Sequence, residues 1–326
     1  MFAGTSTGAI IATLLSWGKP AAEIEKLYVN NSAAMFCREK WLHRFRCKYR
    51  ADVISNCFRE HLSEDDSKQI PALLGSTRLR TKLLMVMRNA STRRTWIITN
   101  HPESPFNDSN QLACDLKLPL WQLLRATTAA PTFFPPEQIA VGAHNFLFVD
   151  GGVTPFANPA LIAVLTTTLA QYRICWPTGR DAVHVISVGT GLFRTRLPPK
   201  NAERINYWDQ LRFIIPTIIS TTSIEQDLAC RIMGDCIHGH PLDPVIGDLE
   251  APTLFAQAEQ KFTYVRYDRE LDAPELAVAR PLRSDMDNLQ LIPSLQAIGR
   301  QYALASIRPE HFWPRGHSRA MKLANG

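Results

Sequence analysis

The opening residues form a strand, turn and helix pattern that restricts how this chain can begin to fold. Met1-Phe2-Ala3 is apolar, Gly4-Thr5-Ser6-Thr7-Gly8 is a run of small residues, and Ala9 to Trp17 is apolar and helix-compatible. The small run matches G-x-S-x-G, in which a serine projects from a sharp turn between a strand and a helix. The sequence therefore predicts Ser6 as a nucleophile. A small-residue turn that only caps a helix is the alternative interpretation.

The residues that flank the serine have their own predicted roles. Small side chains are needed there because the strand and the helix pass close to each other. The N-terminus of the helix adds positive potential near a developing oxyanion, to which the backbone N–H of Thr7 could donate. The predicted elbow and oxyanion positions are Gly4, Thr5, Thr7 and Gly8.

A carboxylate at the end of a later strand is the predicted base. A serine is a poor nucleophile alone and needs a group that accepts its proton. Phe146 to Val149 reads as a buried strand that ends at Asp150, and Gly151 and Gly152 follow and leave the carboxylate uncrowded. Because α/β folds gather their sites at strand ends, we predict Asp150 as the general base. The alternative is a common Asp-Gly turn.

The histidines offer no equally good base. His238 and His240 lie near Asp235 and Asp243, but their spacing matches no standard zinc pattern. We read this segment as a polar loop and predict neither a metal site nor a cofactor. The remaining candidates are isolated in the sequence: His101, His144 and His184.

Strands and helices alternate along the chain, which predicts an α/β layered fold with a mainly parallel sheet. Residues 38–69 are rich in charge and read as helical. One domain over residues 1–310 with a tail at 311–326 is the simplest organisation. In the helical region the expected buried positions are Val53, Phe58 and Leu62.

Composition excludes several classes of protein. The chain has 326 residues, a net charge of +6 and 45% hydrophobic residues. The scattered charge does not indicate nucleic-acid binding, although a mild positive balance favours contact with an anionic membrane surface. The seven dispersed cysteines argue against a disulfide framework, and no secretory signal is visible, so we expect a cytoplasmic protein with peripheral membrane contact.

One apolar segment leaves two interpretations open. Phe213 to Ile219 is too short to span a membrane and contains Pro216. The surrounding residues, Trp208 to Ser220, are either part of the core or an apolar surface that docks on a membrane.

Five segments, taken in order from residue 2 to about residue 305, resemble the patatin-like phospholipases. Each is weak alone, but together they follow the order found in that family. They are Gly4 to Ala9, Arg125 to Pro136, Phe148 to Gly152, Asn158-Pro159 and Val185 to Gly191.

The resemblance implies a three-layer α/β/α patatin-like fold and a Ser-Asp dyad. Ser6 would be the nucleophile and Asp150 the base, in a hydrolysis of glycerolipid acyl esters that passes through an acyl-enzyme and serves lipid catabolism. The family places a loop of the form Asp-Gly-Gly-Gly-x-Arg-Gly before the elbow, where its N–H groups form most of the oxyanion hole. Only five residues precede Ser6 here, so we expect an N-terminally truncated chain that lacks this loop and the first strand. Each lost donor costs about a hundred- to a thousandfold in rate.

Two rival functions remain. An α/β-hydrolase with a Ser-His-Asp triad shares G-x-S-x-G, but its elbow follows several strands and it needs a late histidine. A non-catalytic lipid-binding or regulatory protein on a patatin-like scaffold fits the missing loop, whereas the presence of both Ser6 and Asp150 argues against it.

Overall fold

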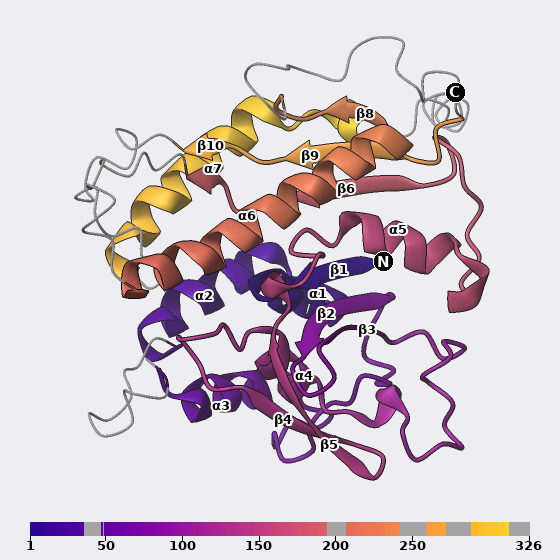
Figure 1. Ribbon diagram of the computed structural model, residues 1–326, viewed down its shortest axis with the longest axis vertical. Coiled ribbons are helices and arrows are strands. Elements are labelled where there is room, and N and C mark those ends of the chain that lie inside the picture. Colours follow the sequence, from indigo (N-terminus) through magenta and orange to yellow (C-terminus); the bar gives the residue numbers. More distant parts are fainter. Residues whose placement is uncertain (36–46, 48, 194–206, 242–258, 272–287, 313–326) are drawn as a thin grey trace. The chain divides into compact units, whose positions relative to one another are not determined.

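The chain divides into two compact units in a computed structural model that describes residues 1–35, 47, 49–193, 207–241, 259–271 and 288–312. The units are Met1–Cys175 and Trp176–Gly326; Figure 1 labels most of their helices and strands. The single domain over residues 1–310 stays a prediction, and most of the tail at 311–326 lies outside the described residues.

The first unit is a mixed arrangement of helices and strands. Its β5 strand is followed by a single turn of 3-10 helix, Gly151–Val153. In order, its main elements are β1 (Phe2–Thr5), α1 (Thr7–Ser16), α2 (Ala21–Met35), α3 (Ala51–His61), β2 (Leu83–Asn89), β3 (Arg94–Thr99), α4 (Leu120–Thr127), β4 (Glu137–Val141), β5 (His144–Asp150) and α5 (Ala160–Thr168).

The strand β2 is the centre of the five-stranded sheet in this unit. It pairs with β3 along one edge. Along its other edge, β1 runs parallel and ends with Thr5 opposite Val86, while β5 runs antiparallel and ends with Asp150 opposite Met87. Since Val86 and Met87 are consecutive, the carboxyl ends of β1 and β5 meet head to head. The strand β4 completes the sheet as the hairpin partner of β5.

Helices cover both faces of this sheet. Successive side chains of a strand point to opposite faces, and the run of apolar residues in β2 is typical of a strand that is buried on both sides. Leu83, Met85 and Met87 belong to a core cluster that includes residues of α1, α3 and α4. Leu84 and Val86 pack with Ile162 of α5. The sheet therefore lies between two helical layers, as the three-layer prediction requires.

The second unit contains smaller sheets and two long helices. The strands β6 and β8 both pair in parallel with β9, and β7 pairs in parallel with β10. None of the helices in the described ranges is long and apolar enough to cross a membrane. The elements are β6 (His184–Val188), β7 (Leu192–Phe193), α6 (Tyr207–Met233), β8 (Asp235–His238), β9 (Thr263–Tyr267), β10 (Glu270–Leu271) and α7 (Ile292–Ser306).

The structure confirms the α/β class. Among the strand pairs of the described residues, four are parallel and three are antiparallel, so parallel pairing is the commoner kind although the sheet of the first unit is mixed.

Two local expectations were wrong. Phe58 and Leu62 are buried as expected, but in α3 Val53 is half-buried and its neighbour Ile54 is buried instead. The segment that ends at His238 is the strand β8 rather than a loop, because pairing with β9 fixes its backbone.

Candidate active site

Ser6 occupies the junction between β1 and α1 in a strained backbone conformation. Its φ is 53° and its ψ is −123°, and a positive φ is uncommon for a residue other than glycine. Such strain persists where the surrounding structure holds it, and it clusters at functional sites. The carbonyl oxygen of Ser6 accepts a hydrogen bond from the N–H of Ala9 at 2.9 Å, which closes the first turn of α1.

The two glycines of the elbow differ in what they allow. A Cβ atom on Gly4 would lie 2.2 Å from the carbonyl oxygen of Gly8, whereas a Cβ on Gly8 itself would have nothing within 4 Å. The steric requirement for a small residue therefore belongs to Gly4. Thr5 anchors the end of β1, because its hydroxyl donates to the carbonyl oxygen of Phe156 at 2.7 Å.

The structure brings Ser6 and Asp150 together. The hydroxyl of Ser6 donates to Oδ2 of Asp150 at 2.6 Å, and the N–H of Gly152 donates to Oδ1 at 2.7 Å. The backbone N–H of Asp150 donates to the carbonyl oxygen of Ala129 at 3.0 Å. Within the part of the chain that the structure describes, these partners of Asp150 include no histidine. Both carboxylate oxygens are thus held, one of them by the candidate nucleophile.

Gly151 is required by the close approach of β1, β2 and the Asp150 turn. A Cβ atom on Gly151 would lie 2.3 Å from the carbonyl oxygen of Val86 and 2.8 Å from Cγ2 of Thr5. Gly152 contributes its backbone N–H to Asp150. The Gly-Gly pair that the sequence singled out therefore has one glycine that fits a tight space and one that binds the carboxylate.

Burial makes Asp150 a stronger base than an ordinary aspartate. The residue is only 6% exposed, and loss of hydration raises its pKa from 3.8 to about 6. The hydrogen bonds from Ser6 and Gly152 and the positive charge of Arg125 oppose this rise in pKa. A carboxylate of this pKa is ionised at neutral pH and accepts a proton more readily than a solvated one.

A segment at the end of α4 holds both members of the pair, and the sequence assigned it no role. Thr127 is fully buried, and its hydroxyl oxygen accepts a hydrogen bond from the N–H of Ser6 at 3.0 Å. The same hydroxyl donates to the carbonyl oxygen of Val86. Arg125 is also fully buried and donates from Nη2 to the carbonyl oxygen of Pro135 at 2.7 Å. The sequence had marked these residues only as part of the Arg125 to Pro136 segment, one of the five that carry the family resemblance.

The remaining predicted groups lie as follows. Thr7 is the first residue of α1 and is exposed, and its role as an oxyanion donor stays a prediction. His238 packs against His311 with ring centroids 4.4 Å apart, so it belongs to the second unit. Among the described residues no group of three or more His, Cys, Asp or Glu side chains could hold a metal ion.

Comparisons with known proteins place the chain in a family. A family model described as Patatin-like phospholipase matches residues 1–164 of the 326. The mouse (Mus musculus) calcium-independent phospholipase A2-gamma is 22% identical, over 71% of this chain and 28% of its own length. Patatin-16 of Solanum tuberosum is 25% identical, over 65% of this chain and 55% of its own length. The chain thus spans between about a quarter and just over half of these relatives.

Among solved structures, VipD from Legionella pneumophila matches with a TM-score of 0.36 and 10% sequence identity, over 93% of this chain and 61% of that one. The assignment rests on the family match, which covers the elbow, the Thr127 segment and the Asp150 turn. The chain belongs to the patatin-like phospholipase family.

Proposed function

We propose that this chain is a lipid acyl hydrolase of phospholipase A type, which cleaves acyl esters of glycerolipids through Ser6 and Asp150 and so serves lipid catabolism. The observation that carries the proposal is the 2.6 Å hydrogen bond from the Ser6 hydroxyl to the Asp150 carboxylate. Its context supports it, since the family is one of lipid acyl hydrolases. The two named relatives are described as a phospholipase A2 and a patatin.

The proposed reaction has two halves. The Ser6 oxygen attacks the carbonyl carbon of the ester while its proton passes to Oδ2 of Asp150. The tetrahedral intermediate collapses, the alcohol of the lipid leaves with that proton, and the acyl group remains esterified to Ser6. Water then attacks the acyl-enzyme while Asp150 accepts one of its protons. The second intermediate releases the fatty acid, and the proton returns to the Ser6 oxygen.

The geometry of Asp150 suits this exchange of protons. Its Oδ1 stays bound to the N–H of Gly152, which leaves Oδ2 directed at Ser6. The positive end of α1 lies at Thr7, the residue after Ser6, and such helix ends favour developing negative charge. Ser6 is therefore in a position to be both activated and electrostatically assisted.

The test compares the chain with its Ser6→Ala variant on phosphatidylcholine in mixed micelles, with free fatty acid as the readout. We expect Ser6→Ala to lose about a thousandfold or more, because it removes the nucleophile. Ser16→Ala is the matched control, since Ser16 lies in α1 with a buried hydroxyl that has no hydrogen-bond partner in the described structure. Equal fatty acid release by the chain and by Ser6→Ala would refute the enzymatic proposal and favour a non-catalytic lipid-binding protein.

We also propose peripheral contact with a membrane surface through α6. Ile214 and Ile218 lie one helical turn apart and are 49% and 39% exposed, and an exposed apolar helix face can enter the interface of a bilayer. The double variant Ile214→Asp/Ile218→Asp should sediment less with anionic vesicles than the parent chain. Thr217→Asp, on the same exposed stretch, adds a charge without removing an apolar side chain. If the double variant sediments with vesicles as much as the parent chain does, the proposal of membrane contact through α6 is refuted.

A further inference from the structure

The hydroxyl of Thr127 lies between two main-chain groups that a longer β1 would join directly. At the start of β1, the N–H of Phe2 donates to the carbonyl oxygen of Lys82 at 2.8 Å. Because the bonds of a parallel ladder are evenly spaced, the same register continued to Ser6 would bring its N–H to the carbonyl oxygen of Val86. Instead, the N–H of Ser6 donates to the Thr127 hydroxyl at 3.0 Å, and that hydroxyl donates to Val86. One side-chain hydroxyl thus takes the place of the next bond of the ladder.

This hydroxyl lets the chain leave β2 at the nucleophile without losing a hydrogen bond. Ser6 has a φ of 53° and a ψ of −123°, which is not the conformation of a strand, so β1 ends at Thr5. Buried N–H and C=O groups nearly always keep a partner. A hydroxyl accepts one hydrogen bond while it donates another, so it can serve both main-chain groups as the turn separates them.

The partners of Thr127 are unusual for a threonine in a helix. Such a hydroxyl commonly donates to the carbonyl oxygen four residues earlier in its own helix, as that of Thr128 does to Leu124 at 2.7 Å. Thr127 is the last residue of α4 and is fully buried, yet its hydroxyl bonds β2 and the junction of β1 and α1. These bonds contribute to the shape of the elbow rather than to α4.

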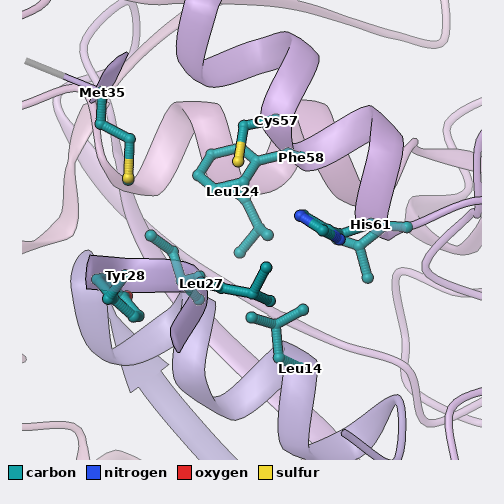
Figure 2. Close-up of a pocket in the computed structure, with 10 residues that line it drawn as sticks. Leu14, Leu27, Tyr28, Met35, Cys57, Phe58, His61 and Leu124 are labelled. Carbon is teal, nitrogen blue, oxygen red and sulfur yellow. The ribbon is translucent and has the colours of Figure 1, made fainter. Parts of the chain in front are cut away.

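Apolar packing of α4 holds the Thr127 hydroxyl in place. Leu124, one turn before Thr127, lines an apolar pocket together with Leu14 of α1 and Phe58 of α3, and Figure 2 shows these side chains directed toward the same space. Other residues of α4 are buried in the same core cluster, namely Leu120, Leu123 and Ala126. The hydroxyl is therefore carried by a helix that is anchored independently of the elbow.

The end of α4 also binds the backbone of the predicted base. The carbonyl oxygen of Ala129 accepts a hydrogen bond from the N–H of Asp150 at 3.0 Å, two residues beyond Thr127. The main chains of Ser6 and Asp150 are thus both bonded to one short segment, which restricts the distance between them. Under this restriction the Ser6 hydroxyl meets Oδ2 of Asp150 at 2.6 Å.

We propose that Thr127 is a positioning residue, whose hydroxyl fixes the backbone of Ser6 so that the nucleophilic oxygen meets Asp150. The proposal rests on the proposed function and adds a third residue, which acts through Ser6 rather than on the substrate. A misplacement of about 1 Å in a reacting group can lower the rate about a hundredfold. Loss of the Thr127 hydroxyl should therefore lower kcat and leave KM nearly unchanged.

The test compares two pairs of side chains at position 127 that differ in the hydroxyl. Thr127→Val keeps the shape of threonine, and we expect its kcat on p-nitrophenyl butyrate to fall about a hundredfold with little change in KM. Thr127→Ser should retain most of kcat, whereas Thr127→Ala should lose it. The serine and alanine variants decide the matter if Thr127→Val fails to fold. Thr128→Val is the matched control, because it removes a buried hydroxyl that bonds within α4, and its kcat should stay near that of the parent.

A second readout needs no turnover. The hydrogen bond from Ser6 lowers the pKa of Asp150, so a Ser6 that no longer meets the carboxylate should leave this pKa higher. NMR titration of the Asp150 carboxyl carbon measures it. We expect Asp150 to titrate at a higher pH in Thr127→Val than in the parent chain, and at an unchanged pH in Thr128→Val.

The outcomes separate the role of Thr127 from the proposed function. Ser6-dependent hydrolysis with equal kcat in Thr127→Val and the parent, or in Thr127→Ser and Thr127→Ala, overturns the role and leaves the hydrolase. An equal fall in kcat in Thr128→Val also overturns it, because the loss would then reflect packing at the end of α4. A higher pKa of Asp150 in Thr127→Val than in Thr128→Val, without Ser6-dependent hydrolysis, overturns the hydrolase and leaves Thr127 as the residue that places Ser6.

Discussion

The hydroxyl of Ser6 lies 2.6 Å from Oδ2 of Asp150, although 144 positions separate them in the sequence. The reason is the register of β2, on which β1 ends at Val86 and β5 ends at Met87. The two strands approach from opposite directions along one edge, so the residue after β1 faces the last residue of β5. The backbone hydrogen bonds of β1 and β5 to β2 therefore bring Ser6 and Asp150 close together, independently of any contact between their side chains.

Activity should fall as the pH drops through the pKa of Asp150. The carboxylate must be ionised to accept the Ser6 proton, and burial raises the pKa of Asp150 to about 6. We expect kcat/KM to be constant above that pH and to decline about tenfold per unit well below it. A pH profile of a soluble ester, whose own ionisation does not change, measures this. A decline centred near 3.8, the ordinary pKa of an aspartate, would contradict the raised pKa of Asp150.

Asp150→Asn should abolish activity and stabilise the fold at alkaline pH. The pKa of Asp150 is higher in the folded chain, about 6, than its ordinary 3.8. Its favourable contribution to stability is therefore full below pH 3.8 and is lost as the pH rises through 6. At pH 8 the amide avoids the cost of a buried charge, and we expect a gain of about 1 to 3 kcal/mol in the free energy of unfolding. Urea denaturation at pH 8 tests it, and a less stable variant would contradict the burial argument.

Arg125 should influence the pH at which kcat/KM declines on the acid side, through its effect on the pKa of Asp150. Its positive charge lowers the pKa of Asp150, so Arg125→Met should move the decline in kcat/KM to higher pH. Arg125→Lys keeps the charge and should move it less. The measurement is the pH profile of both variants, with thermal unfolding to establish that they fold. Identical profiles in Arg125→Met and the parent chain would show that Arg125 acts only in packing.

The elbow should tolerate alanine at Gly8 and not at Gly4. A Cβ atom on Gly4 would clash with the carbonyl oxygen of Gly8 at 2.2 Å, whereas Gly8 has free space. We expect Gly4→Ala to destabilise the chain by about 1 to 3 kcal/mol and Gly8→Ala, within α1, to stabilise it by about 0.5 to 1 kcal/mol. Chemical denaturation of both variants measures the difference. Equal stabilities would contradict the close approach of β1 to α1.

Asp115 should lower the stability of the chain at neutral pH. It is 2% exposed, and burial raises its pKa from 3.8 to about 6 against a hydrogen bond from Trp96. Its favourable contribution is therefore present below pH 3.8 and lost as the pH rises through 6. Asp115→Asn should be more stable than the parent at pH 8, and the difference should shrink toward pH 4. Urea midpoints across this range test it, and a difference independent of pH would contradict it.

Much of the order of helices and strands could be predicted from the sequence. The two strands discussed below were missed because they form only by pairing with a strand from elsewhere in the chain. The apolar run before Asp150, bounded by the two glycines that follow, predicted β5, and the longer apolar run after Ser6 predicted α1. The strands β4 and β8 were not predicted. Residues Glu137–Val141 and Asp235–His238 become strands by pairing with β5 and β9, and neither short segment has a pattern of its own.

By itself, the sequence determined the type of the two functional groups and their places at strand ends. The small residues before Ser6 and the glycines after Asp150 each limit the local backbone to a turn, and that limit is a property of the residues. Only the tertiary structure decided that these ends meet, that Gly4 and not Gly8 fills the close contact, and that Thr127 joins the elbow to β2. These relationships depend on pairing register and on burial between distant segments, which no local pattern of residues encodes.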